Sequence, residues 1–451
     1  MSLPNQEQGV TEPLPAVDDT YPVPPLTPRT GFLSVLQNRN FLEIWLAQVT
    51  SQTAQNSLWY ALIIMVGAIT GEKPVTVGFT IIMVQLPTVL FSSVSGVFVD
   101  RLPKRSILIG TNVLRVVGVL GYLLLQHNLA GLYVITFVVA VLSQPFAPAE
   151  GSTIPLLVSG EQLITANSLF QLTFMGAQGV GFALAPIAIT VLGVTTTLIA
   201  LSALFAVAAL VLIPLPSPTR HSAATQPILL SDLGRRVIHD LLEAIHFIID
   251  DPPLAVALLQ LSLAPTLLLL LAEVGPDYVA NTLHFGQTST ALFFLLAPAG
   301  IGLGLGMFVL GQFGARLRKD RLVLVSLIAL GITVIGLAAV PLEASFWQQL
   351  HSIGFPIPSG VGFTVTMFPI TVLMGLEVAF VNAPAQTIVQ ERAAPAVRGR
   401  VLAMQQTLTA AVAIPPLIVV GGVATLIGVP ATLTLTGIAI TVIGLVLVYY
   451  A

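Results

Sequence analysis

The few ionisable residues that interrupt the apolar stretches of this sequence are the ones best placed to do chemistry. Of the 451 residues, 55% are hydrophobic and 8% are charged, whereas soluble domains carry about 25% charged residues. An ionisable group inside a membrane is costly and tends to be functional. Among the acids in such stretches are Glu273, Asp277 and Glu377. We take them as candidates for proton exchange.

Each acid has a competing interpretation. Glu273 lies about 30 Å along its segment from Pro253, so it forms either an outer gate or proton site, or part of a wet helix end. For Asp277, just beyond Pro276, the wet end is favoured, and Pro276 is expected to break the helix. Glu377 lies about 24 Å into its segment. It either exchanges protons or pairs with a cytoplasmic arginine.

Arg115 is the cation that falls inside an apolar stretch, about 15 Å from Arg105 along a helix. Arginine keeps its proton and therefore needs a counter-charge or water. Glu43 lies at a similar inner depth, so we predict a structural ion pair between Glu43 and Arg115. The alternative is that Arg115 binds an anionic group of a substrate.

Uncharged polar residues form a stripe on the first apolar segment, at i, i+4, i+7 and i+8. The alternative to a ligand cavity is interhelical hydrogen bonding, worth about 1 kcal/mol per contact. A cavity of amides and aromatic residues suits bulky amphipathic compounds. The predicted cavity residues are Gln48, Gln52, Gln55, Asn56, Trp59, Gln171, Gln178 and Asn382.

Other chemistries find no support in the sequence. It has no cysteine, and its six histidines lack metal-ligand spacing. It has no phosphate-binding loop of the G-x-x-x-x-G-K-[ST] type. The net charge of −3 does not indicate nucleic acid as a partner. We therefore expect no enzyme activity, no metal and no cofactor.

The elements that position these residues are twelve apolar segments, each long enough to span a membrane as a helix. With the N-terminus inside, only Lys73 of the 17 Lys and Arg residues falls outside and only Arg115 falls within a span. We predict an all-α, multi-pass, monomeric protein of the cytoplasmic (inner or plasma) membrane, with both termini cytoplasmic. The segments are 41–70, 76–99, 106–126, 130–148, 165–191, 194–214, 254–280, 288–312, 321–341, 361–383, 400–426 and 429–450.

The chain divides into a polar tail, two six-helix halves and a linker. Residues 1–37 are predicted to be a disordered cytoplasmic tail, 38–214 the N-terminal half and 254–451 the C-terminal half. Between them, 215–253 is a cytoplasmic linker with an amphipathic helix. The stretch Gly311 to Lys319 echoes Gly96 to Lys104, so the two halves are predicted to be pseudo-symmetric.

The pattern G-x-x-x-D-R-x-x-K-R at 96–105 resembles the loop between helices 2 and 3 of the major facilitator superfamily. Stretches 38–51, 148–169 and 382–401 further resemble its drug:proton antiporter-3 branch of macrolide-efflux and siderophore-export proteins. The resemblance implies a latch in which Asp100 meets an arginine and a helix N-terminus. The alternative is that the charges only fix orientation. The predicted gating residues are Gly96, Asp100, Arg101, Lys104, Arg105, Arg398 and Arg400.

The chain also departs from that branch, because Gln52 to Asn56 carry no acid where such exporters often have one in helix 1. The leading hypothesis is a secondary transporter, a proton-coupled exporter of hydrophobic or amphipathic small molecules working by alternating access. Its partners are then a small-molecule substrate, protons and the lipid bilayer. The alternatives are a proton-independent facilitator or lysolipid-type flippase, and a non-transporting receptor or scaffold.

Overall fold

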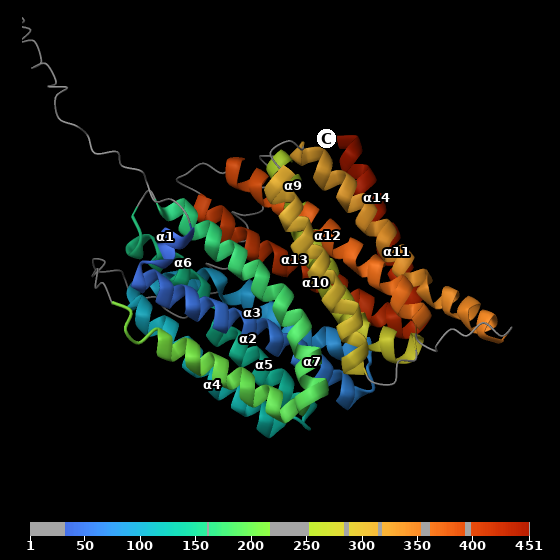
Figure 1. Ribbon diagram of the computed structural model, residues 1–451, viewed down its shortest axis with the longest axis horizontal. Coiled ribbons are helices and arrows are strands. Elements are labelled where there is room, and N and C mark those ends of the chain that lie inside the picture. The colour runs from blue at the N-terminus through green and yellow to red at the C-terminus, as the bar shows by residue number, and fades with distance from the viewer. Residues whose placement is uncertain are drawn as a thin grey trace, which may run out of the picture.

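The computed structural model describes residues 32–159, 162–216, 252–283, 288–313, 318–352, 361–392 and 398–450. In these ranges the chain is almost entirely helical, and the helices pack side by side as an elongated bundle (Figure 1). The helices before residue 216 gather on one side and those after residue 252 on the other. We call the end that carries the turn between α3 and α4 the inner end, after the orientation predicted from its charges.

The N-terminal half consists of one short helix followed by long, nearly antiparallel helices. Asn38 caps the first long helix by accepting hydrogen bonds from the backbone N–H groups of Asn40 and Phe41. The helices are α1 (Phe32–Leu36), α2 (Arg39–Thr70), α3 (Pro74–Arg101), α4 (Lys104–Leu125), α5 (Leu129–Ser143), α6 (Phe146–Leu157) and α7 (Leu163–Val211).

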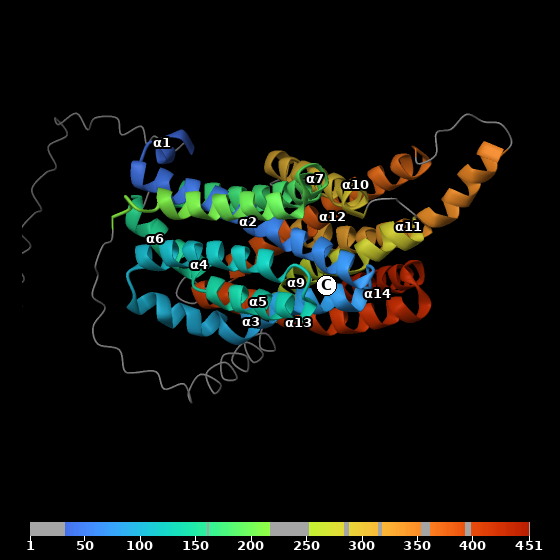
Figure 2. The same ribbon diagram turned by 90° about the horizontal axis from the view of Figure 1, so that it is seen from below.

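The C-terminal half repeats this arrangement of long, nearly antiparallel helices. Its α11 has 34 residues, or about 51 Å of helix, so it is longer than the membrane core and projects past its neighbours (Figure 2). The helices are α9 (Pro252–Asp277), the π-helix η2 (Tyr278–Thr282), α10 (Thr288–Phe313), α11 (Lys319–Ser352), α12 (Val361–Arg392), α13 (Arg398–Ile427) and α14 (Val429–Tyr450).

The twelve predicted spans all fall on these helices. Nine described segments are long and apolar enough to cross a membrane by themselves. The other three predicted spans lie on α2, on the first part of α7 and on α10. The polar stripe lowers the mean hydropathy of α2, and within α10 the part whose side chains the structure describes without a gap is the shorter apolar stretch Leu295–Leu310. The fold is thus an all-α membrane bundle of two six-helix halves.

Glycine and proline set the breaks between spans. Spans 5 and 6 join in α7 at Gly193, whose φ of 78° and ψ of 165° are available almost only to glycine. Span 4 is divided into α5 and α6 at Gln144 and Pro145. The expected break at Pro276 is wrong in detail, because α9 continues to Asp277 and then widens into η2.

Small residues let the helices approach closely, both within and between the halves. Helices α10 and α12 touch at Gly302, where an added Cβ would overlap the carbonyl oxygen of Val372. The halves meet chiefly along two helix pairs, α3 with α13 and α7 with α10, and α9 also contacts α3 and α2. In the second pair, a Cβ on Gly300 would lie 3.4 Å from the carbonyl oxygen of Gly179. In the first, Ser92 and Thr407 share a 2.7 Å hydrogen bond.

The predicted tail is wrong at its end. Residues 32–36 form α1, and Val35 is fully buried among the apolar side chains of the inner end, with Phe41 and Phe146. Burial of the apolar Val35 side chain favours this short helix. The prediction missed it because residues 1–31, which precede it, are polar. Residues 1–31 and the predicted amphipathic helix at 231–250 lie outside the described residues.

Candidate functional site

Arg115 organises a polar network inside the N-terminal half. Its Nη1 donates to Ser51 Oγ on α2 at 2.8 Å, and its Nε donates to Ser143 Oγ on α5 at 3.0 Å. Ser51 in turn donates to Asn112 Oδ1 at 2.9 Å, and Ser51 and Asn112 are fully buried. The guanidinium carbon lies 4.5 Å from the ring centre of Phe146, which adds a cation–π contact.

The predicted ion pair between Glu43 and Arg115 is wrong. Glu43 pairs with Arg39 one turn earlier, with 3.1 Å between Oε1 and Nε. The residue of α2 that reaches Arg115 is Ser51, which lies eight positions and about 12 Å farther along the helix. The sequence estimate of depth was too coarse to separate these two levels.

Glu150 on α6 is the counter-charge that the sequence reasoning missed. Its side chain is buried, and it attracts Arg115 electrostatically. The predicted span 4 ended at 148, so Glu150 fell outside the predicted spans. The signal was available, because Ser143, Phe146 and Glu150 fall at i, i+3 and i+7 and all face Arg115.

A cavity of about 160 Å³ lies beside this network, enclosed by α2, α3, α4 and α5. Arg115 and Ser143 line it, and so do Gln55 and Trp59 from the predicted stripe. The buried carbonyl oxygen of the Gln55 side chain has no hydrogen-bond partner. A buried polar atom without a partner costs free energy, so a ligand or water that satisfies Gln55 is favoured there.

The other predicted cavity residues do not line this cavity. Gln48 donates to the Phe170 carbonyl oxygen of α7 at 3.2 Å, as the interhelical alternative predicted. Asn56 donates to the Gln52 carbonyl oxygen of its own helix, and Gln171 is exposed. Gln178 is half-buried, as is Asn382, whose Oδ1 is buried without a partner.

A larger, mostly apolar cavity of about 480 Å³ lies closer to the inner end, between α3, α4 and the junction of α5 with α6. Gln144 lines both cavities and donates to Thr88 Oγ1 of α3 at 3.2 Å. The larger cavity is walled by side chains such as Phe98, Leu102 and Leu114, whose exposed fractions are 53%, 42% and 41%.

The C-terminal half buries two carboxyl groups that have no cationic partner among the described residues. Glu377 on α12 accepts a 3.0 Å hydrogen bond from Thr333 on α11, and its second oxygen has no partner. Glu273 on α9 is fully buried, and neither of its oxygens has a partner. Asp277 instead accepts a 2.7 Å bond from Asn281 at an exposed helix end, as its favoured interpretation predicted.

The predicted gating turn is only partly described. Lys104 donates to the Ser152 carbonyl oxygen of α6 at 3.0 Å, and Arg105 donates to that of Ile213, just after α7. These two cations therefore fasten the turn to the inner ends of α6 and α7. The structure does not describe the surroundings of the remaining predicted gating residues, Gly96, Asp100, Arg101, Arg398 and Arg400. The latch therefore stays a prediction.

Known proteins share this architecture. The sequence profile of the Major Facilitator Superfamily matches residues 44–416. The chain belongs to this superfamily. No curated protein sequence matches it. A structure of the nucleoside transporter NupG superposes with a TM-score of 0.66 at 15% identity, covering 90% of this chain and 98% of that one. The POT family transporter PepTSo gives a TM-score of 0.63 at 13% identity, covering 92% and 97%.

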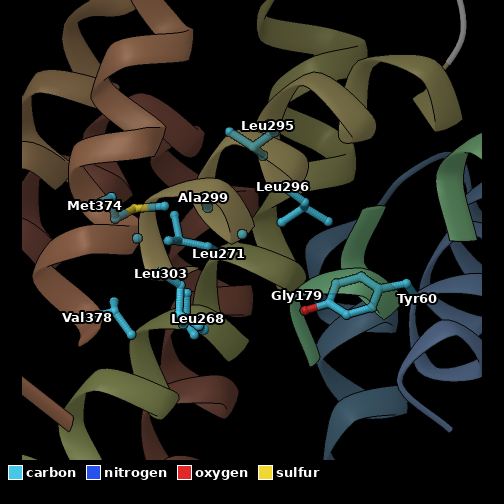
Figure 3. Close-up of a pocket in the computed structure, with 12 residues that line it drawn as sticks. Tyr60, Gly179, Leu268, Leu271, Leu295, Leu296, Ala299, Leu303, Met374 and Val378 are labelled. Carbon is cyan, nitrogen blue, oxygen red and sulfur yellow. The ribbon is translucent and has the colours of Figure 1, made fainter. Parts of the chain in front are cut away.

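Membership in the Major Facilitator Superfamily makes the chain a multi-pass membrane transporter, whose substrate path is expected between the halves. That region is closed here by apolar side chains (Figure 3). Tyr60 and Gly179 of the N-terminal half approach leucines of α9 and α10, and only about 20 Å³ remains between them. This is roughly room for one water, so the structure is sealed at this level.

Proposed function

We propose that the protein is a proton-coupled exporter of hydrophobic or amphipathic small molecules, working by alternating access in the cytoplasmic membrane. The two halves would rock about α3–α13 and α7–α10 to expose a substrate site to each side in turn. As in the sequence analysis, Glu377 and Glu273 are the proposed proton carriers.

One contrast between the halves carries the coupling proposal. In the described part of the N-terminal half, the buried acids Glu43 and Glu150 each have a cation: Glu43 pairs with Arg39, and Glu150 attracts Arg115. In the C-terminal half Glu273 and Glu377 have none among the described residues. A buried carboxyl group without a cation is far less costly with a proton than without one, so each can bind and release a proton as its surroundings change.

The cavities support the substrate class. The larger one offers apolar walls with a few polar groups from Ser95, Ser106, Thr111 and Gln144. The smaller one adds the cation Arg115 and the amide of Gln55. Nucleosides and peptides, the substrates named for the similar structures, carry many polar groups that these walls would leave without partners. An amphipathic compound fits better.

Export of a lipophilic dye such as rhodamine 6G tests the proposal. Inside-out vesicles containing the protein should accumulate the dye when their lumen is acidified, and a protonophore should abolish the accumulation. Glu377→Gln should lower the accumulation at least severalfold, because the glutamine cannot exchange a proton. The control is an equal amount of membrane that contains the wild-type protein at the same content. Equal accumulation with and without the pH gradient would reject proton coupling.

The second candidate function is a proton-independent lysolipid-type flippase. The exposed apolar wall formed by Phe98, Leu102 and Leu114 favours it, since an acyl chain could lie there. Liposomes with a fluorescent lysophospholipid decide between the two. Rapid transfer of the lipid between leaflets, unaffected by a pH gradient, would favour the flippase over the exporter.

A further inference from the structure

The carboxyl group of Glu273 lies between the two halves, in a space left by two glycines. An added Cβ on Gly78 of α3 would overlap Glu273 Oε1, and so would one on Gly421 of α13. Gly78 belongs to the N-terminal half, whereas Glu273 and Gly421 belong to the C-terminal half. The carboxyl group thus occupies the contact between α3 and α13, where any larger residue would exclude it.

This contact lies near the outer end of the bundle. Gly78 comes four residues after α3 begins at Pro74, and Gly421 comes six residues before α13 ends at Ile427. Both helix ends are opposite the α3–α4 turn. The backbone of Val75 also approaches Gly421, because a Cβ there would lie 3.2 Å from the Val75 Cα atom. The two helices are therefore closed tightly over Glu273.

The surrounding titratable groups do not compensate a charge on Glu273. On α9, Asp277 is bonded to Asn281, and Glu377 of α12 is bonded to Thr333. Lys73, before α3, is exposed, and the Tyr278 hydroxyl of η2 donates to Leu337. Other ionisable groups at this end include Tyr60 at the apolar seal, Glu72, which lies against Gly67, and Tyr133 of α5, whose hydroxyl donates to the Thr76 carbonyl oxygen. Residues 405–427 of α13 contain no ionisable residue.

An ionised carboxylate in such a site would lose its hydration without gaining a partner, which is strongly unfavourable. A neutral carboxyl group avoids most of that cost. The closed arrangement of α3 over α13 is therefore compatible with Glu273 only when the carboxyl group carries its proton. Separation of the two helices would admit water, and the charged form would then be stable.

We propose that Glu273, seated between Gly78 and Gly421, is a proton-operated lock of the outer gate. The gate closes around the carboxyl group once that group has taken a proton from the outer water, and the charged form is stable only while the gate is open; no other bond changes. The proposal rests on the proposed alternating-access function for its role in transport, but the lock itself is a property of the structure. It identifies the side on which this proton is exchanged.

The sign of the pH dependence follows from linkage. The closed state binds one more proton than the open state, so raising the pH favours the open state. The ratio of open to closed protein should change by up to about tenfold per pH unit for one proton. The dependence should level off at low pH, where both states carry the proton.

Spin-label distances across the outer end test the lock in the full-length protein in nanodiscs. The sequence has no cysteine, so Lys73→Cys and Leu426→Cys place one label on each half; Lys73 is exposed and Leu426 is 84% exposed. The long-distance population should grow with pH. In Glu273→Gln it should stay small at every pH, because the amide cannot ionise. An unaltered pH dependence in Glu273→Gln would overturn the proposal.

A size-exchange pair separates the lock from general damage. Gly78→Ala should increase the long-distance population, since the three atoms nearest to its Cβ would all belong to Glu273. Adding Glu273→Ala should restore the short distance and remove the pH dependence. Gly422→Ala is the control, because its Cβ would meet nothing within 4 Å. If the double variant stays open, the lock is not at this contact.

The outcomes also separate the lock from the proposed function. Dye export that depends on the pH gradient, together with a Glu273→Gln gate that still responds to pH, would keep proton coupling and reject the lock. A gate that titrates through Glu273 in a protein whose transport ignores the pH gradient would keep the lock and reject coupled export.

Discussion

At the scale of single residues, the described part of the chain buries its acids in two ways: Glu150 is attracted by the cation Arg115, whereas Glu273 and Glu377 have no cationic partner. Glu273 and Glu377 stood out because a charge within an apolar stretch is conspicuous in any sequence. Glu150 was missed because the predicted span 4 ended at 148. In the structure the chain turns at Pro145 and continues as the helix α6, which carries Glu150. Which residue meets Arg115 depends on helix rotation and depth, and neither is visible in a single sequence.

The electrostatic attraction between Arg115 and Glu150 leads to a residue-scale prediction. Arg115→Met should lower stability by about 3–5 kcal/mol, because it leaves a buried acid without its cation. Glu150→Gln should also destabilise, and the two losses combined in one protein should be smaller than their sum. Thermal unfolding in detergent measures all three variants. Additive losses would mean that the two side chains do not interact.

At the scale of helices, the boundaries were predictable and the contacts were not. Lys104 and Pro74 start helices within two residues of the predicted positions, because charges and prolines mark span ends. The junction at Gly193 also left a trace, since the predicted spans 5 and 6 meet beside it. The glycines that face another helix carry no such mark, because facing a neighbour is a property of the packed bundle.

The close contact of α10 with α12 gives a prediction with a control on the same helix. Gly302→Ala should destabilise by about 1–3 kcal/mol, because its Cβ would overlap the Val372 carbonyl group. Gly304→Ala meets nothing within 4 Å and should be neutral or slightly stabilising. The melting temperatures of the two variants test this. Equal values would contradict the proposed packing.

The junction of α7 gives a second prediction at this scale. Gly193→Ala should cost about 1–3 kcal/mol, since the backbone there is strained for any residue with a Cβ. Its Cβ would meet nothing within 4 Å, so the cost would come from the backbone alone. Gly176→Ala, in the same helix and also without close neighbours, is the matched control. Chemical denaturation measures the free energy of unfolding of both variants. A Gly193→Ala variant as stable as the Gly176→Ala control would contradict the strained junction.

At the scale of the whole molecule, the twelve spans, the two halves and the superfamily were predictable from hydropathy, charge distribution and a short motif. The region between the halves was not. It depends on which helices meet, here α3 with α13 and α7 with α10, and on the closed arrangement in this structure. The glycines around Glu273 acquire meaning only when the two halves are seen together.

Proton movement measured with substrate movement tests the central claim most directly. In proteoliposomes that contain a pH-sensitive dye, addition of rhodamine 6G should drive protons in the direction opposite to the transported compound. Glu273→Gln and Glu377→Gln combined should abolish this proton movement while the protein stays folded. If the substrate crosses the membrane with no accompanying proton movement in the unmodified protein, the account of a proton-coupled transporter is contradicted.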